Sequence, residues 1–451
     1  MKFKNIKVHE LLFLIIKYMN FRKEIMKNKS KLYWRKLDDQ AKVFALASNN
    51  KYSSIFRLSV VLKEEINKEL LEKAVRLTLE KYKVFKVKMR KGLFWYYFEE
   101  NEKEPIIIEE REFPFTKINT KENNDYLFRI TYFSSKINIE FFHALTDGTG
   151  GFEFLNDIVY RYLELKYSDE LVADKVNEKM ILKESENAYR KNYNYTGKKN
   201  RKLKKAYLLK GETLETGEFA INHFNINVND FKNLSKEKGC TISAYLVAMI
   251  AYSIYETNYK INDGKRPINI SVPISLRKYF PSETISNFFS YMIINVNLKY
   301  NKKYMFEDIL EIVKKEFEKK MKVEKMIQTI TEDAGKTNNI FIRIVPLLIK
   351  KMAVRVGSLQ VKKYFTLTFS NMGKVIVEEK YSKYIENFFV ILAPDWAEKV
   401  KCGVCSYGND LVITFTTILK GSSLECKFRD LLKENKINLK IEGNGVNVIS
   451  D

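Results

Sequence analysis

The sequence predicts an α/β protein with mixed sheets, built from two subdomains. Segments that alternate apolar and polar residues, as half-buried strands do, are interspersed with segments of helical periodicity in both halves of the chain. A length of 451 residues exceeds one ordinary core and suggests two domains of about 200 residues each. Residues 190–217 are dense in Lys and Arg and poor in periodic apolar residues, which is typical of a solvated linker. We therefore divide the chain into an amphipathic segment 1–30, a first subdomain 31–189, a basic linker 190–217 and a second subdomain 218–451.

The first half is expected to run from strand to helix and back to strands. Residues 54–62 are rich in β-branched side chains and predict a strand, and a helix follows with Asn67 as a candidate cap. Further strands are expected at 84–88, 93–99 and 106–108. Residues 127–133 and 136–142 form a predicted hairpin across Ser134-Ser135, which delivers the next segment to the end of a strand.

That next segment contains His143, Asp147 and Gly148 in the pattern His-x3-Asp-Gly. After it, apolar residues recur at helical spacing and predict a helix that ends near Tyr167, with Thr146 or Asp147 as its cap. The glycines allow the backbone to turn sharply and to approach a ligand closely. We therefore expect the histidine to be held on rigid structure.

General-base chemistry at neutral pH has few candidates, because the chain has three histidines, His9, His143 and His223. An imidazole with a pKa of roughly 6.5 can take a proton from a hydroxyl, amine or thiol as that group attacks a carbonyl. Asp147 either orients the ring directly or pins the loop through an arginine, and the sequence leaves both geometries open. The alternative is a buried structural histidine followed by an ordinary Asp-Gly turn.

The second half restarts with a predicted strand at 219–228 and a helix at 244–257 that Thr241-Ile242-Ser243 opens. Strands are expected at 267–274 and 291–298, on either side of Arg277 and Asn287. Residues 305–357 are helical by period and are interpreted as outer scaffold or lid. A strand at 364–369 runs into Ser370-Asn371-Met372-Gly373, which without further information is a turn. Strands at 388–392 and 411–418 and a helix from 423 to about 433 complete the half.

Composition narrows the function classes. The formal charge of +23 favours anionic partners, but the basic residues are spread along the chain, so cofactor phosphates fit better than nucleic acid. Of the four cysteines, Cys402 and Cys405 form one Cys-x2-Cys pair with no histidine nearby, so we expect plain structural cysteines in a reducing compartment and no metal site. No glycine-rich phosphate loop of a known type is present.

The location of the chain is expected to be cytoplasmic. No apolar run approaches the ~20 residues that cross a bilayer, and no cleavage site follows the apolar residues 11–16. Lysines and arginines flank those residues. Residues 1–27 therefore either pack on the protein body or lie on the anionic inner face of the membrane as a peripheral contact.

The motif around His143 resembles the active-site motif of the chloramphenicol acetyltransferase-like superfamily, which includes condensation domains, plant BAHD acyltransferases, wax ester synthases and bacterial alcohol acetyltransferases. Condensation domains carry two adjacent histidines, whereas this chain has Phe142-His143, which looks more like the alcohol acetyltransferase branch. Three further phrases resemble this branch in the expected order. These are Lys36-Leu37-Asp38 within 33–48, Val272-Pro273-Ile274-Ser275-Leu276-Arg277 followed by Asn287-Phe288, and Ser370-Asn371-Met372-Gly373.

The resemblance implies a fold and a reaction. The fold is two chloramphenicol acetyltransferase-like subdomains that form a V around a central tunnel. The reaction is transfer of an acyl group from a thioester, acyl-CoA as co-substrate, to a small-molecule alcohol or amine, with His143 as general base and with no permanently bound cofactor. By the same resemblance Arg277 is the salt-bridge partner of Asp147, Gly148 lies at the substrate, and Ser370 or Asn371 donates to the oxyanion.

Two alternatives stay open beside this reading. One is condensation-type transfer from an acyl carrier protein, and the other is a non-catalytic binding or scaffold relative of the same fold. The mechanism requires the imidazole to face a passage between the two lobes, so a ring sealed in an apolar interior would exclude it.

Overall fold

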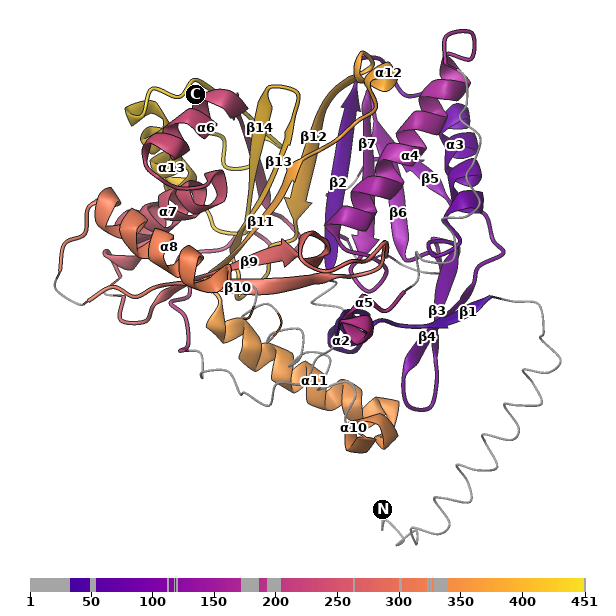
Figure 1. The fold of residues 1–451 in the computed structure, drawn as a ribbon, viewed down its shortest axis with the longest axis horizontal. Coiled ribbons are helices and arrows are strands. Elements are labelled where there is room, and N and C mark those ends of the chain that lie inside the picture. Colours follow the sequence, from indigo (N-terminus) through magenta and orange to yellow (C-terminus); the bar gives the residue numbers. More distant parts are fainter. Residues whose placement is uncertain are drawn as a thin grey trace, which may run out of the picture.

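The computed structural model describes residues 33–48, 54–171 apart from 112, 117, 119 and 120, 186–192, 204–299 apart from 263, 302–322, 324, 327 and 340–449. The described residues form two lobes, each built on its own large sheet (Figure 1). The predicted segment 1–30, with its proposed membrane contact through residues 1–27, and residues 193–203 of the predicted linker lie outside the described residues.

The first lobe is a five-stranded sheet in the order β12-β2-β7-β6-β5. Its strands are β2 (Ile55–Leu62), β5 (Ile107–Glu109), β6 (Phe128–Phe133), β7 (Lys136–Phe142) and β12 (Ile385–Leu392). Helices α3 (Lys68–Lys81) and α4 (Gly148–Lys166) lie against each other beside this sheet (Figure 1). Buried apolar residues of β2, β7, α3 and α4 form one continuous core.

The predicted helix cap and hairpin of this lobe are confirmed. The side chain of Asn67 accepts a hydrogen bond from the backbone N–H of Leu70 at the start of α3. Ser134 takes a positive φ of 49° in the turn between β6 and β7. The strand expected at 84–88 begins later, at β3 (Val87–Lys91), because the backbone N–H of Phe85 donates to Tyr82 O in a turn that ends α3.

A small three-stranded sheet extends the first lobe, in the order β1-β4-β3. Its other strands are β1 (Trp34–Lys36) and β4 (Tyr96–Glu100). Helix α2 (Asp39–Ala47) follows β1, and the short helix α5 (Ala188–Lys191) lies close to α2 in Figure 1. The sequence marked 33–48 as a phrase but predicted no helix there.

The second lobe is a seven-stranded sheet in the order β10-β9-β11-β13-β14-β8-β15. Its strands are β8 (Ala220–Asn227), β9 (Ile268–Ser275), β10 (Phe289–Val296), β11 (Leu367–Lys374), β13 (Val400–Tyr407), β14 (Asp410–Thr417) and β15 (Leu439–Gly443). Helices gather on the outer side of this sheet: α6 (Val228–Glu237), α7 (Ile242–Ile254), α8 (Phe306–Lys320) and α13 (Ser423–Glu434) (Figure 1). Helix α7 is buried on nearly all sides, since Leu246, Ile250 and Ile254 have no exposed surface.

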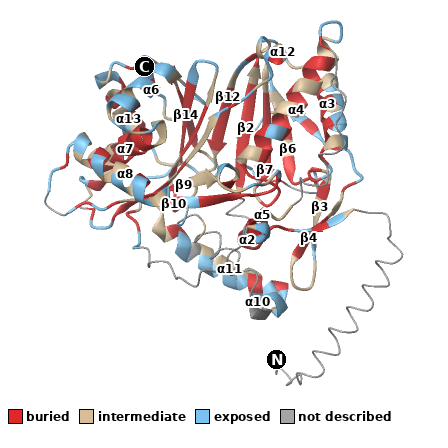
Figure 2. Cartoon of the chain, viewed as in Figure 1, coloured by how far each residue is buried: buried red, intermediate tan, exposed pale blue. Residues whose placement is uncertain are grey.

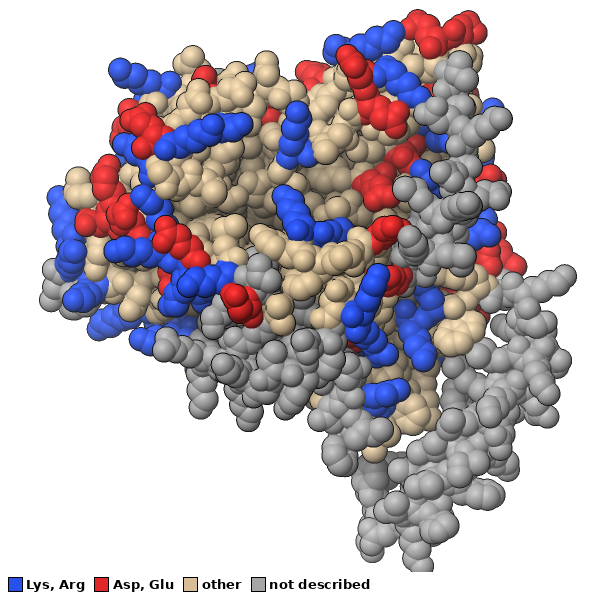
Figure 3. All heavy atoms as spheres, viewed as in Figure 1, with Lys and Arg blue, Asp and Glu red and all other residues tan. Residues whose placement is uncertain are grey.

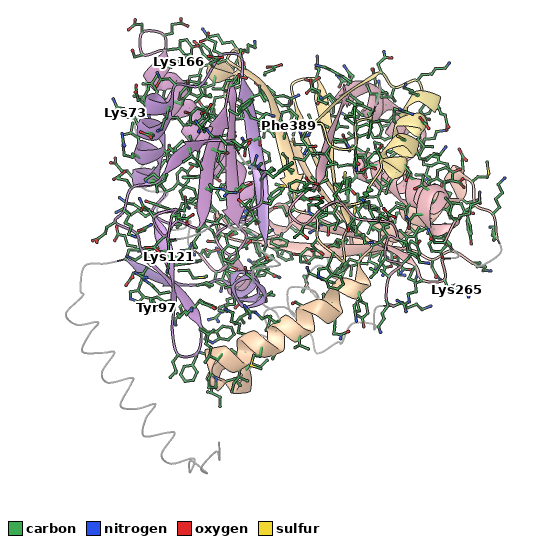
Figure 4. All side chains as sticks on the ribbon, turned by 180° about the vertical axis from the view of Figure 1, so that it is seen from behind. Lys73, Tyr97, Lys121, Lys166, Lys265 and Phe389 are labelled. Carbon is green, nitrogen blue, oxygen red and sulfur yellow. The ribbon has the colours of Figure 1, made fainter. Side chains whose placement is uncertain are left out.

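Strand β12 joins the two halves of the chain. It comes from the second half of the sequence but pairs with β2, in the register Val390↔Leu58 and Phe388↔Val60. Cys405 Sγ of β13 donates to Phe388 O, so β12 also touches the second sheet. Phe389 lies at the junction between the lobes, where its ring meets that of His223 with centroids 4.4 Å apart (Figure 4).

Helices α10 (Ile340–Ile344) and α11 (Leu347–Val361) run beneath both lobes (Figure 1). Helix α11 packs against α2, and the backbone N–H of Leu347 donates to Leu93 O between β3 and β4. The prediction of helical structure within 305–357 is therefore confirmed for α8, α10 and α11. No helix in the described part of the chain combines the length and apolarity that a bilayer crossing requires.

Candidate active site

His143 follows β7 directly and is held by its backbone and by three aromatic rings. Its backbone N–H donates to Ser54 O at 2.9 Å. The imidazole stacks on Phe44 of α2, with ring centroids 4.3 Å apart and an interplanar angle of 13°. Phe56 of β2 and Phe289 of β10 flank it at centroid distances of 4.9 Å and 5.4 Å. The two lobes therefore both contribute to the setting of one half-buried ring.

Asn287 fixes the tautomer of that ring. Its amide nitrogen Nδ2 faces two acceptors, His143 O at 3.0 Å and Asp38 Oδ2 at 3.3 Å, so its oxygen Oδ1 must face His143 Nδ1, which lies 3.2 Å away. A carboxamide oxygen only accepts, so Nδ1 carries the proton. The lone pair of the neutral imidazole is therefore on Nε2, the nitrogen on the other side of the ring.

The surroundings keep His143 neutral. Burial lowers the pKa of the imidazole below its ordinary value of 6.5, and the positive charge of Lys401 acts in the same direction. The charge of Asp147 and the hydrogen bond with Asn287 raise the pKa but do not outweigh the burial. At neutral pH the ring is consequently in the form that accepts a proton.

Asp147 pairs with Arg277 and caps a helix. Its Oδ2 accepts from Arg277 Nη1 at 2.8 Å and from the backbone N–H of Phe288 at 2.8 Å. Its Oδ1 accepts from the backbone N–H groups of Thr149 and Gly150, the first turn of α4. Of the two geometries that the sequence left open, the structure therefore contains the arginine pair, and Asp147 is the residue that caps the helix.

Two glycines of the motif are explained by close contacts. A Cβ at Gly150 would lie 2.1 Å from Ile285 O, so only glycine lets the second lobe approach α4 here. The hydroxyl of Thr146 donates to the same carbonyl at 2.5 Å. Gly148 lines the cavity, and a Cβ there would lie 2.5 Å from the terminal methyl carbon of Met372 on β11.

A cavity of about 2580 Å³ lies between the lobes and includes His143 in its wall. Segments of α2, β2, β9, β10, β11, β13 and α11 contribute to its lining. The imidazole is thus not sealed in an apolar interior. The lining includes acidic side chains and also cationic ones, which are Arg277, Lys278, Lys319, Lys320, Lys362, Lys374 and Lys401.

Ser370 and Asn371 lie in β11 and both line this cavity. They are part of a strand, with an irregularity in the pairing to β13 between Asn371 and Lys374, rather than the turn after a strand that the local pattern indicates. Asn371 Nδ2 donates to Ser243 Oγ at 3.0 Å, and its Oδ1 accepts from the backbone N–H of Gly373. The Ser370 hydroxyl makes a longer contact, 3.9 Å to Met372 Sδ. The Asn371 amide is thereby engaged within the protein, whereas the Ser370 hydroxyl makes only the weak contact with Met372.

Sequence reasoning missed two residues that position the His143 ring, Asn287 directly and Asp38 through Asn287. Asn287 stood only as part of a family phrase, and its role needed the contact across 144 residues of chain. Asp38 caps α2 through a 2.7 Å bond from the backbone N–H of Ala41 and accepts from Asn287. Burial raises the pKa of Asp38 to about 6. The Lys36-Leu37-Asp38 phrase marked this position without revealing that Asp38, Asn287 and His143 form one chain of contacts.

His223, Cys402 and Cys405, which the sequence analysis also considered, do not line the cavity. His223 Nδ1 lies 2.8 Å from Thr414 Oγ1, and burial lowers the pKa of this histidine to about 3. His9 lies outside the described residues. Cys402 and Cys405 are free thiols in β13, and burial raises the pKa of both. Within the described ranges, no three His, Cys, Asp or Glu side chains converge as metal ligands.

The distribution of charged side chains on the surface is relevant to nucleic-acid binding. On the face shown in Figure 3, blue and red side chains are both distributed around a tan, hollowed centre. A nucleic-acid binder is expected to concentrate positive charge on one face. This face does not have that pattern.

Comparison with known proteins identifies the fold. No protein-family model matches the sequence, and no curated protein sequence matches it significantly. Among solved structures, TRI101 of F. graminearum complexed with coenzyme A and deoxynivalenol matches with a TM-score of 0.60 and 10% identity over 90% of this chain and 99% of that chain. TRI3 trichothecene 15-O-acetyltransferase from Fusarium sporotrichioides matches with a TM-score of 0.52 and 11% identity over 90% and 95%. The starter condensation domain of rhizomide synthetase RzmA matches with a TM-score of 0.51 and 10% identity over 90% and 96%. The chain therefore shares the fold of these acetyltransferases and condensation domains, with one lobe on either side of the cavity.

Proposed function

We propose that this protein is an acyltransferase that moves an acyl group from a thioester, acyl-CoA in the first instance, to a hydroxyl or amine acceptor. One observation carries the proposal: the His143 imidazole lines an interlobe cavity with Nδ1 engaged by Asn287, so that the lone pair is on Nε2. A histidine held in one tautomer and kept neutral by burial has the properties of a general base.

The reaction follows from that geometry. His143 Nε2 takes the proton of the acceptor as its oxygen or nitrogen attacks the thioester carbonyl, and the carbonyl electrons move onto oxygen. The tetrahedral oxyanion collapses, the carbon–sulfur bond breaks, and the thiolate leaves with the proton from the imidazolium. No covalent enzyme intermediate is needed in this scheme.

Ser370 is the proposed donor to the oxyanion. Ser370 lines the cavity, and its hydroxyl makes a 3.9 Å contact with Met372 Sδ, a weak acceptor that leaves the hydroxyl able to rotate toward a ligand. Asp147 and Arg277 have a supporting role, because their ion pair connects the first turn of α4 to the loop before Phe288. Gly148 lines the cavity next to Asp147, and its lack of a side chain leaves room for the Met372 side chain of β11.

Acyl-CoA is proposed as the acyl donor because of the cationic side chains in the cavity lining and because of a similar solved structure. The cations in the cavity lining suit the phosphates of coenzyme A. The TRI101 neighbour was crystallised with coenzyme A. Coenzyme A enters and leaves as a co-substrate in this proposal, and no permanent cofactor is required.

A carrier-protein thioester is the second candidate donor, because a condensation domain is among the neighbours. Phe142, buried at the end of β7, stands where condensation domains have the first of two histidines. This favours a free acyl-CoA and an alcohol acetyltransferase-like reaction.

Thiol release from short and long acyl-CoAs against a panel of alcohols and amines tests the proposal. We expect His143→Ala to lower the rate by about 10²–10⁴-fold with the fold intact. His223→Asn is the matched control, since His223 is buried away from the cavity lining and its loss leaves the chemistry in place. Equal rates for His143→Ala and the wild type would remove the mechanism, and turnover with acyl carrier protein alone would establish the second donor.

A further inference from the structure

Within the described part of the chain, helix α11 presents an exposed apolar face. Leu348, Met352 and Val356 recur every four residues and are 77%, 71% and 63% exposed. Ile349 on the same helix and Ile344 at the end of α10 are exposed beside them. We call these five residues the α11 outer face. Large aliphatic side chains exposed side by side to this degree are typical of an interaction site.

The opposite side of α11 is anchored to the protein. Lys350 is buried, donates to Phe94 O at 2.9 Å and lies 3.7 Å from the centre of the Trp95 ring. Ala353, Val354, Gly357, Ser358 and Val361 line the interlobe cavity. The helix is therefore a wall of the cavity with a second, apolar side that faces away from the protein body. Figure 2 shows it largely in the colours of exposed and intermediate residues, along the lower edge of the molecule.

The charged residues in the stretch of sequence that contains α10 and α11 are all basic. The 44 residues from Ala334 to Val377 contain no Asp or Glu, although the chain has 56 acidic residues in total. Within residues 340–364 the basic residues are Arg343, Lys350, Lys351, Arg355, Lys362 and Lys363. Arg343 is exposed, and Lys351, Arg355 and Lys363 are half-buried. An exposed aliphatic face, on a stretch of chain that has basic residues and no Asp or Glu, is complementary to an anionic lipid surface.

We propose that the α11 outer face docks the protein onto the surface of an anionic lipid bilayer. Aliphatic side chains on a helix at the edge of the molecule can insert among lipid headgroups and acyl chains, while basic residues of the same stretch meet lipid phosphates. Docking there places the lipid against one side of the helix whose other side lines the cavity. This is a different surface from residues 1–27, and it does not depend on whether the protein transfers acyl groups.

Sedimentation of the full-length protein with lipid vesicles tests the docking without any turnover. We expect binding to vesicles that contain phosphatidylglycerol, weaker binding to phosphatidylcholine alone, and weaker binding as salt is raised. The variant Leu348→Ser/Met352→Ser/Val356→Ser should lower the partition coefficient by about tenfold or more. Ile261→Ser/Val448→Ser is the matched control, because Ile261 and Val448 are equally exposed, at 71% and 76%, on the second lobe.

Three results would overturn the docking proposal. The first is a triple variant that sediments like the wild type. The second is loss of binding only when Leu12→Ser/Ile16→Ser is introduced, which would place the contact in residues 1–27. The third is a wild type that ignores vesicles but forms a dimer that the triple variant cannot form, which would make the face a self-association site. Met352→Glu provides a single-site version, expected to weaken binding by charge repulsion, should the triple variant not fold.

Discussion

Replacing Asn287 by alanine removes three interactions at once. His143 Nδ1–H loses its acceptor, and His143 O and Asp38 Oδ2 lose the amide that donates to them. Asn287 has 1% of its surface exposed, so water does not simply take its place. The imidazole remains in the cavity but is no longer restricted to the tautomer with a free Nε2.

The magnitude follows from the value of one buried hydrogen bond. The bond from Nδ1–H to Asn287 strengthens by about 1–1.5 kcal/mol when the ring becomes the imidazolium, which is worth roughly 5- to 12-fold in rate, so Asn287→Ala should lower kcat/KM by about tenfold. This is well short of the loss from removing the base itself. The two oxygens left without the Asn287 amide should destabilise the fold by about 1–3 kcal/mol.

The pH dependence of kcat/KM separates a positioning role from a structural one. The bond with Asn287 raises the pKa of His143, so its loss should move the acid limb, already below 6.5 through burial, to still lower pH. The control is Asn101→Ala, which removes another fully buried amide, bonded to Asn124 O at 2.8 Å and outside the cavity lining. An Asn287→Ala enzyme with the rate and acid limb of Asn101→Ala would refute the positioning role.

Three further predictions concern Asp147, Ser370 and Asp38. Asp147→Ala should lower the free energy of unfolding by about 3 kcal/mol or more, because it unpairs Arg277 and removes the cap of α4. Urea denaturation measures this, and a loss below about 1 kcal/mol would contradict the prediction. Ser370→Ala should lower kcat by about 10²-fold with little change in KM. Asn371→Ala should instead act mainly on the stability of the fold, because the Asn371 amide is bonded to Ser243. Equal effects of the two variants on kcat would exclude Ser370 as the hydrogen-bond donor to the oxyanion. The pKa of Asp38 is raised from its ordinary value of 3.8 to about 6 in the folded protein. Between these two pH values the folded state binds more protons than the unfolded state. The contribution of Asp38 to the free energy of unfolding is therefore lost as the pH rises through 6. Relative to Asp38→Asn, the wild type should therefore lose about 1.4 kcal/mol of stability between pH 5 and pH 8, measured by denaturation at both pH values, and a pH-independent difference would contradict the raised pKa.

Local patterns were enough to locate the motif within the fold. The alternation at 136–142 predicted β7 with its observed bounds, and the helical period after Asp147 predicted α4 to within a residue. Asn67 was recognised as a candidate cap because a cap bonds to backbone only three residues away. The pairing of Asp147 with Arg277 came from resemblance rather than from any pattern in this sequence.

Long-range contacts account for what local patterns left out. Strand β12 follows β11 in sequence but pairs with β2 in the other lobe, and no periodicity within 385–392 reveals its partner. Ser370 and Asn371 looked like a turn, yet their pairing with Gly403 and Val404 keeps them in β11. The sequence also did not predict that Leu348 and Met352 are exposed, because apolar residues at helical spacing ordinarily indicate the buried face of a helix.

The sequence by itself determined where the histidine, the helix cap and most strands lie, because these depend on residues a few positions apart along the chain. Only the tertiary structure decided which nitrogen of His143 is basic and which side of α11 meets the solvent. Both depend on groups more than a hundred residues away, Asn287 in one case and the β3–β4 hairpin in the other, which packing alone brings into contact.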